Sequence, residues 1–253
     1  MVINIDVRKE KDKFEENEIE LINNIFGLFV KNVYFSMKAN IKIEEDQKFI
    51  NFTGISGVGK TVIKDEIKDQ AQQSKSENIH IIDFDDLDDS TFYGRNILEI
   101  LNIHSKDDEI LKILSGFGLF EMRILTQKYE TLSQGQKTRL KYIYLFNSIE
   151  NDKQNYIFID EFLTFVDDLS GISFASNIKK YLSDKNVKLF TFGVNFNLIG
   201  QFEDVTYVLG NSTISAIIKN NKIEYLHNDK IFEDIKINKN TPKEINQSIL
   251  EDW

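Results

Sequence analysis

The segment "GISGVGKT", residues 54–61, constrains the fold more than any other feature of the sequence. It fits the pattern in which two glycines separated by four residues precede Lys and Thr, and it lies between an apolar run (48–53) and an amphipathic run (61–73). Glycines in such a loop let backbone N–H groups point at phosphate oxygens, and the start of the following helix adds the positive end of its dipole. The sequence therefore predicts a strand, a phosphate-binding loop and a helix.

The loop residues have predicted roles in holding a nucleotide. Lys60 is expected to neutralise the β and γ phosphates, and Thr61 to offer its hydroxyl to Mg²⁺. The nucleotide contacts are expected along the whole loop, which comprises Gly54, Ile55, Ser56, Gly57, Val58, Gly59, Lys60, Thr61 and Val62.

The rest of the chain alternates between apolar runs and helical patterns. Four short apolar runs are predicted as buried strands: 48–53, 79–84, 156–160 and 187–194. Helices are predicted near 61–73, 95–126 and 172–183. This alternation predicts an α/β fold with a mostly parallel core sheet, in one domain spanning residues 1–253.

The two ends of the chain follow other patterns. Residues from about 10 to 31 have the apolar spacing of a helix, and 35–43 alternate like a half-buried strand. Near the C-terminus, "VTYVLG", "STISAIIKN" and "KIEYLH" predict short antiparallel strands. A final short helix is predicted from Thr241, and we treat residues 216–253 as a C-terminal extension.

The run "YIFIDE" ends in two acids at the carboxyl end of a predicted buried strand. Ligands gather at this edge of open α/β sheets. Asp160 is expected to hold the Mg²⁺ shell, and Glu161 to orient or deprotonate an attacking water.

Between these two segments lies "LSQGQ", residues 132–136, at the head of an apolar and basic helix. Ser133 can cap that helix and donate its hydroxyl, and Gly135 permits close backbone approach to an anion. Together with the other two motifs, in this order, the segment resembles the signature of the ATP-binding-cassette (ABC) ATPases. The resemblance implies that the signature residues contact the γ-phosphate of ATP held by the opposite subunit: Ser133, Gln134, Gly135 and Gln136.

The resemblance runs from about residue 22 to 215 and implies a helical subdomain, near 90–145, that carries the signature. "FLTFVDD" follows Glu161 as the family's D-loop would, which puts Asp167 at its acidic position. The usual Pro-Thr after the glutamate is Phe162-Leu163 here. This wording is more similar to a soluble branch found with acetyltransferase-like domains than to transporters.

Two family elements are missing. The glutamine of the family's Q-loop has no clear counterpart here. Asp83 or Asp85 could lie near the metal instead. We favour the alternative, in which both belong to a solvated acidic loop. No histidine directly follows the last predicted core strand (187–194), and Asn195 is the residue closest to the position that a histidine would occupy. An amide cannot take or give a proton as an imidazole does, so we expect slow turnover.

The composition and charge of the chain limit which partners and which cellular compartment we expect. The absence of cysteine, the charged N-terminus and the lack of a long apolar run lead us to expect a cytoplasmic protein without membrane insertion. A net charge of −10 makes independent nucleic-acid binding an unfavoured role, and we take the basic positions on the signature helix as a solvated face: Lys137, Arg139 and Lys141. The aromatic that stacks on the base could be Phe26, Phe29 or Tyr34, although an aromatic in an N-terminal amphipathic segment is more often part of the core.

The resemblance implies an ATP hydrolase with ATP and Mg²⁺ as ligands. Two ATP molecules would be sandwiched in a head-to-tail homodimer, with Glu161 as base, Lys60 stabilising charge and Asn195 at the γ-phosphate. A protein partner, such as an acyltransferase or effector subunit, would receive the conformational change. Two alternatives stay open: the nucleotide-binding subunit of a transporter, and an ATP-sensing module that hardly hydrolyses.

Overall fold

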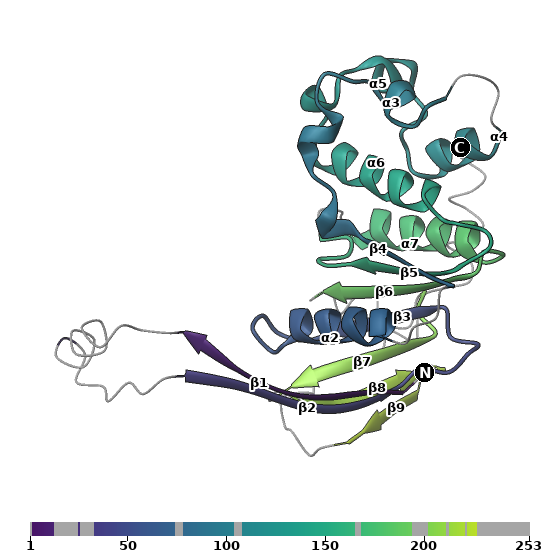
Figure 1. Cartoon of the computed structure of the whole chain (residues 1–253). Coiled ribbons are helices and arrows are strands. Elements are labelled where there is room, and N and C mark those ends of the chain that lie inside the picture. The colour runs from purple at the N-terminus through teal and green to yellow at the C-terminus, as the bar shows by residue number, and fades with distance from the viewer. Residues whose placement is uncertain are drawn as a thin grey trace.

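The computed structural model describes residues 2–12, 25, 33–73, 78–103, 108–164, 168–193, 202–210, 213–220 and 222–226. A central sheet carries one long helix, α2 (Lys60–Gln73), on one face and two, α6 (Gln134–Asn147) and α7 (Asp168–Leu182), on the other. A separate two-stranded ribbon covers the outer side of α2 (Figure 1). The predicted α/β architecture with a mostly parallel sheet is confirmed.

The central sheet has seven strands in the order β4-β5-β6-β3-β7-β8-β9. Their bounds are β3 Phe49–Thr53, β4 Ile79–Asp83, β5 Gln154–Ile159, β6 Val187–Gly193, β7 Val205–Gly210, β8 Thr213–Lys219 and β9 Lys222–Tyr225. The pairs from β4 to β7 are parallel, and β8 and β9 continue the sheet antiparallel. Because β3 lies inside the parallel part, the glycine-rich loop that follows it emerges among the carboxyl ends of its neighbours.

The sequence prediction for β7 was half wrong. We expected an antiparallel strand, and β7 is antiparallel to β8 but parallel to β3, with Ile50 opposite Val205. All six residues of β7 are buried, the pattern of a strand covered on both faces. β7 is therefore the strand at which the sheet changes from parallel to antiparallel.

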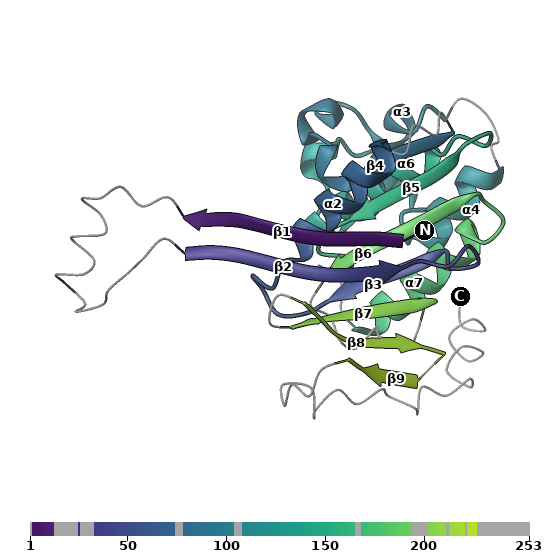
Figure 2. The ribbon, with the colours of Figure 1, turned by 60° about the horizontal axis from the view of Figure 1, so that its bottom comes forward.

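The N-terminal ribbon corrects another prediction. Residues 10–12, expected to begin a helix, belong to β1 (Val2–Asp12), which pairs antiparallel with β2 (Val33–Lys42). Of the remaining helix prediction only Ile25 is described, and it is helical. Ile3 and Ile5 are buried on one side of the ribbon, opposite Ile41 and Ala39. The ribbon extends well beyond the core sheet (Figure 2).

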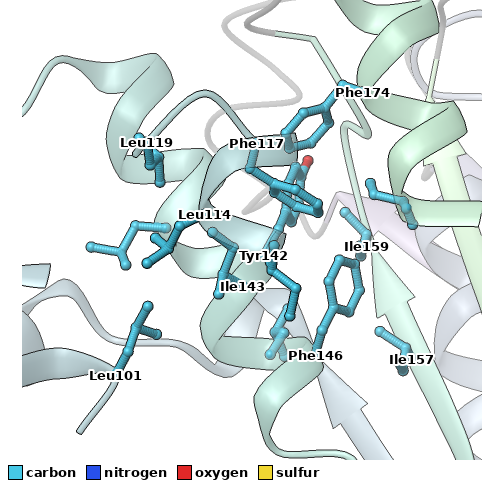
Figure 3. Packing of buried hydrophobic residues seen from close by; sticks show 14 of the residues in the cluster. Leu101, Leu114, Phe117, Leu119, Tyr142, Ile143, Phe146, Ile157, Ile159 and Phe174 are labelled. Carbon is cyan, nitrogen blue, oxygen red and sulfur yellow. The ribbon is translucent and has the colours of Figure 1, made fainter. Parts of the chain in front are cut away.

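Two hydrophobic clusters fill the two faces of the sheet. The first lies between the sheet, α2 and the ribbon, and α2 contributes Ile63, Ile67 and Ala71 to it. The second lies under α6 and α7, where Tyr142 and Phe146 of α6 face strand residues of β5 (Figure 3). The loop-to-α2 segment and the signature helix α6 are thus held on opposite faces of the sheet.

The helical part that precedes α6 consists of short elements. The expected helical stretch at 95–126 forms α3 (Ile97–Ile100), α4 (Asp108–Gly116) and α5 (Met122–Thr126). Three short 3₁₀ helices flank them: η1 (Phe84–Asp86), η2 (Asp89–Phe92) and η3 (Tyr129–Thr131). Residues 241–253, for which a helix was predicted, lie outside the described residues. None of the helices in the described part of the chain has the length and apolar character needed to cross a membrane.

Candidate nucleotide site

The loop between β3 and α2 has the backbone that its glycines allow. Gly57 and Gly59 have φ angles of 79° and 109°, which residues with a side chain rarely adopt. Gly54 lies so close to the neighbouring strand that an added Cβ would be 2.7 Å from the backbone oxygen of Leu209. Glycine at position 54 is therefore required by contact with β7.

Lys60 begins α2 and turns back over the loop. Its Nζ donates hydrogen bonds to the backbone oxygens of Gly54, at 2.8 Å, and Ile55, at 3.0 Å. Burial lowers the pKa of Lys60, and the charges of Asp160 and Glu161 partly offset this. The two acids predicted to work with Lys60 are thus close enough to act on its charge.

The other loop residues divide by exposure. Val58 is buried, Gly59 and Val62 are half-buried, and the remaining side of the loop is open to solvent: Ile55, Ser56, Gly57 and Thr61. The exposed side is the one available to a phosphate chain.

Asp160 and Glu161 directly follow β5, as predicted. The backbone N–H of Glu161 donates to Oδ1 of Asp160 at 2.9 Å, and Glu161 has a φ angle of 49°. A non-glycine residue in the left-handed region carries strain that is commonly found at functional sites. Both acids line a cavity of about 280 Å³ together with Phe84, Asp85, Thr138 and Tyr142.

The donors suit a magnesium ion that keeps most of its shell for phosphate and water. Among the described residues no three His, Cys, Asp or Glu side chains come together as a protein-only metal site. Mg²⁺ prefers one or two protein oxygens completed by phosphate oxygens and water. The hydroxyl of Thr61 and the carboxylate of Asp160 are donors of this kind.

The signature segment begins α6. Ser133 is its N-cap: Oγ accepts from the backbone N–H of Gln136, whose Oε1 accepts in turn from the N–H of Ser133. Because Oγ only accepts in this cap, its own hydrogen is available for another acceptor. Ser133 and Gln134 are exposed, and Gly135 and Gln136 are half-buried. The segment lies on the face of the sheet opposite α2, away from its own chain's loop.

The arrangement matches solved ATP-binding cassettes. A dimeric bacterial ABC transporter cassette superposes with a TM-score of 0.55 at 17% identity, over 90% of this chain and 100% of that one. The same cassette, in a post-hydrolysis dimer bound to ADP and Pi, gives 0.55 at 18% identity, with the same coverage. A bacterial Atm1-family ABC exporter with ATP bound gives 0.52 at 14%, over 86% of this chain and 38% of that one. The chain has an ATP-binding-cassette fold. No protein-family model and no curated protein sequence matches it.

Within this cassette fold, Phe162 and Leu163 anchor the segment after Glu161. Both are buried, and the ring of Phe162 stacks on Phe202 with centroids 5.4 Å apart. The N–H of Leu163 approaches the hydroxyl of Tyr142 at 3.5 Å. Two apolar side chains thus hold the carboxyl end of β5 against the core.

The acidic run after β4 is only partly the solvated loop that we favoured, because Asp85 and Asp86 are exposed but Asp83 is buried. The side chain of Asp83 is only 1% exposed and forms ion pairs with Lys64 and Lys68. Asp85, half exposed, pairs with Lys64 and lines the same cavity as Asp160 and Glu161. The cassette therefore has a carboxylate at the edge of this cavity.

The basic positions of α6 are also engaged within the chain and do not form a solvated face. Lys137 lies over the ring of Tyr129, Arg139 donates to the backbone oxygen of Phe117, and Lys141 pairs with Asp89. These three side chains are therefore half-buried and in contact with other parts of the chain.

Some predicted residues cannot be placed, and one was missed. Asp167, Asn195, Phe26 and Phe29 lie outside the described residues, as does the side chain of Tyr34. The sequence reasoning missed Lys64. The spacing of lysines at 60, 64 and 68 puts them on one helix face and was the signal that could have found it.

Proposed function

We propose that this chain is an ATPase that binds Mg-ATP and closes into a head-to-tail homodimer. The observation that carries the proposal is the placement of Lys60, Asp160 and Glu161 at one edge of the parallel sheet, where the charges of both acids act on the lysine. Transfer of a phosphoryl group to water uses a phosphate-binding loop, a carboxylate that can bind the metal, and a second acid that can act as a base.

In the proposed reaction the loop N–H groups and Lys60 hold the β and γ phosphates. Thr61 and Asp160 would hold the Mg²⁺, which would neutralise charge that develops on the phosphoryl oxygens. Glu161 accepts a proton from the water that attacks the γ-phosphorus, and the bond to the bridging oxygen of ADP breaks. With Asn195 where a histidine would move protons, turnover is expected to be slow.

The dimer follows from where the signature lies. Ser133 heads α6, the sheet separates it from α2, and its hydroxyl hydrogen has no acceptor in the cap. An anion at this helix start would have to come from another molecule, and the nucleotide held by the loop of a second copy would supply one. Dimeric cassettes of the same fold support this arrangement.

The switch is proposed to act on a protein partner in the cytoplasm, such as an acyltransferase or an effector subunit, without membrane insertion. Phe162 and Leu163 favour the non-transporter branch over a transporter subunit. The alternative function, as the nucleotide-binding subunit of a transporter, stays open because the solved cassettes of this fold come from transporters.

The first experiment measures the mass of the protein in solution with and without Mg-ATP. Glu161→Gln should form a stable ATP-dependent dimer, because ATP is bound but not consumed. Ser133→Arg should stay monomeric, and Ser183→Arg, an exposed serine beside the Lys48 that precedes β3, should dimerise as the wild type does. A mass that ATP does not change in any variant would exclude the homodimer.

A further inference from the structure

The helix that starts at the nucleotide loop carries three lysines on one face. Lys60, Lys64 and Lys68 are one turn apart, so their side chains lie in a row along α2. Lys60 reaches the loop, whereas the next two reach the end of β4. The side chain of Lys64 is only 6% exposed, so its charge is held inside the protein.

The carboxylates that receive Lys64 and Lys68 control the turn after β4. Asp83 accepts from Lys68 at 2.5 Å, lies 3.6 Å from the ammonium of Lys64, and caps η1 through the N–H of Asp85 at 3.0 Å. Asp85 pairs with Lys64 directly. Burial alone would lower the pKa of Lys64, but the carboxylates of Asp85 and Asp83, with Asp160 farther away, outweigh burial and raise it. Lys64 is therefore charged and bound on two sides.

The segment that Lys64 holds forms part of the wall of the cavity beside Asp160 and Glu161. Phe84 and Asp85 line this cavity together with both acids. Phe84 packs on Tyr142 of α6, with ring centroids 5.1 Å apart. The ion pair between Lys64 and Asp85 thus links α2, which starts at the nucleotide loop, to the wall of the cavity that packs against α6.

Stability alone does not explain this pair. The ammonium of Lys64 must leave water to form the pair, whereas the carboxylate of Asp85 stays half exposed, and the cost of burying a charge offsets much of what an ion pair contributes to stability. Asp83 is already neutralised by Lys68 at the shorter distance. Lys64 therefore serves mainly the second carboxylate, that of Asp85, which lines the cavity.

We infer that Lys64 is a positioning residue of the proposed ATPase, which holds the Asp85 carboxylate at the cavity so that it orients water around the reacting phosphate. The inference rests on the proposed function. Oriented acceptors of this kind act on the transition state more than on bound ATP. The loss should therefore appear in kcat and leave nucleotide affinity almost unchanged.

The test compares four variants in steady-state hydrolysis and in binding of a non-hydrolysable ATP analogue. Lys64→Met and Asp85→Asn should each lower kcat about tenfold to a hundredfold, with the affinity for the analogue within about twofold of wild type. The double variant should be no slower than the worse single one, because both remove the same contact. Lys64→Arg should recover most of the rate.

Lys68→Met is the matched control. It lies one turn farther along α2 and pairs with the same Asp83, but it does not touch Asp85. Its kcat should stay within about twofold of wild type, whatever it does to the unfolding temperature. Equal losses in Lys64→Met and Lys68→Met would overturn the inference, since both would then report only a damaged fold. Multiplying losses in the double variant would overturn it too.

Two further outcomes separate this inference from the proposed function. If Lys64→Met does not fold, Asp85→Asn decides, because that side chain is 50% exposed and its amide is close in shape. A wild-type protein without ATP hydrolysis would overturn the proposed function and this inference together. An active wild type with an unchanged Asp85→Asn variant would overturn this inference alone.

Discussion

At the scale of single residues, Gly54 shows how a neighbouring strand determines which residue type a position can hold. Gly54→Ala should lower the free energy of unfolding by about 1–3 kcal/mol, because the new methyl group collides with the backbone oxygen of Leu209. Moving the loop also displaces its N–H groups, so ATP binding should weaken about tenfold. Thermal unfolding and ATP titration measure the two effects.

Gly116→Ala is the control for this substitution. Its Cβ would meet nothing nearer than the side chain of Asn177 at 3.6 Å, and Gly116 ends α4. Alanine suits a helix better than glycine, so the change in stability should stay within about 1 kcal/mol. An equal loss at both positions would show that contact with β7 is not the cause.

The sequence predicted the positions of the residues that lie in local motifs, and their roles stay predictions. The loop glycines, Lys60, Asp160 and Glu161 lie where their flanking strand and helix place them. Lys64 was not predicted, because its value depends on carboxylates that the chain brings to it only after β4 has paired in the sheet. A motif describes neighbours in sequence, and this ion pair joins neighbours in space.

At the scale of elements, Tyr207 joins the ribbon to the sheet. Its hydroxyl, on β7, donates to the backbone oxygen of Lys42 at the end of β2, at 2.7 Å. Tyr207→Phe should therefore cost about 1 kcal/mol near pH 8, where the hydroxyl is neutral. Urea unfolding measures it, and Tyr93→Phe, with Tyr93 58% exposed, should change nothing.

The same residue predicts a dependence on pH. Burial, and then the charge of Glu44, raises the pKa of Tyr207 to about 12. An unfolded tyrosine ionises near pH 10, so the folded chain keeps a proton that the unfolded chain loses. Stability from this group is complete below about pH 10 and is lost as the pH rises toward 12. Tyr207→Phe should make that fall shallower, and an unchanged slope would contradict the assignment.

The two element predictions that failed concern pairing between distant segments. β1 was partly taken for helix because its charged end shows no alternation, while its partner lies some thirty residues later in sequence. β7 was taken as antiparallel because its neighbour in sequence is a hairpin partner, whereas its other edge pairs with β3. The local hydrophobic pattern predicted the approximate position of a strand where the sequence alternated or was wholly apolar. It did not predict which other strand that strand would pair with.

At the scale of the whole molecule, the proposed site is divided between two chains. Lys60 and Glu161 come from one copy and Ser133 from the other, so two different inactive chains should complement each other. In a mixture of Lys60→Ala and Ser133→Arg, each dimer that contains both variants has one intact site, because the Ser133→Arg chain supplies Lys60 and Glu161 and the Lys60→Ala chain supplies Ser133. Because Ser133→Arg alone is expected to stay monomeric, the mixture should hydrolyse ATP faster than the sum of its two components measured apart, at no more than about half of the wild-type rate.

A second mixture controls for partial activity and for refolding on mixing. Lys60→Ala and Glu161→Gln damage the same half of the site, so no mixed dimer of these two contains an intact site. This mixture should hydrolyse no faster than the sum of its components measured apart. If the first mixture were equally inactive while its chains still paired, a site completed by the partner's Ser133 would be excluded. If both mixtures gained activity, the site would not be divided in this way.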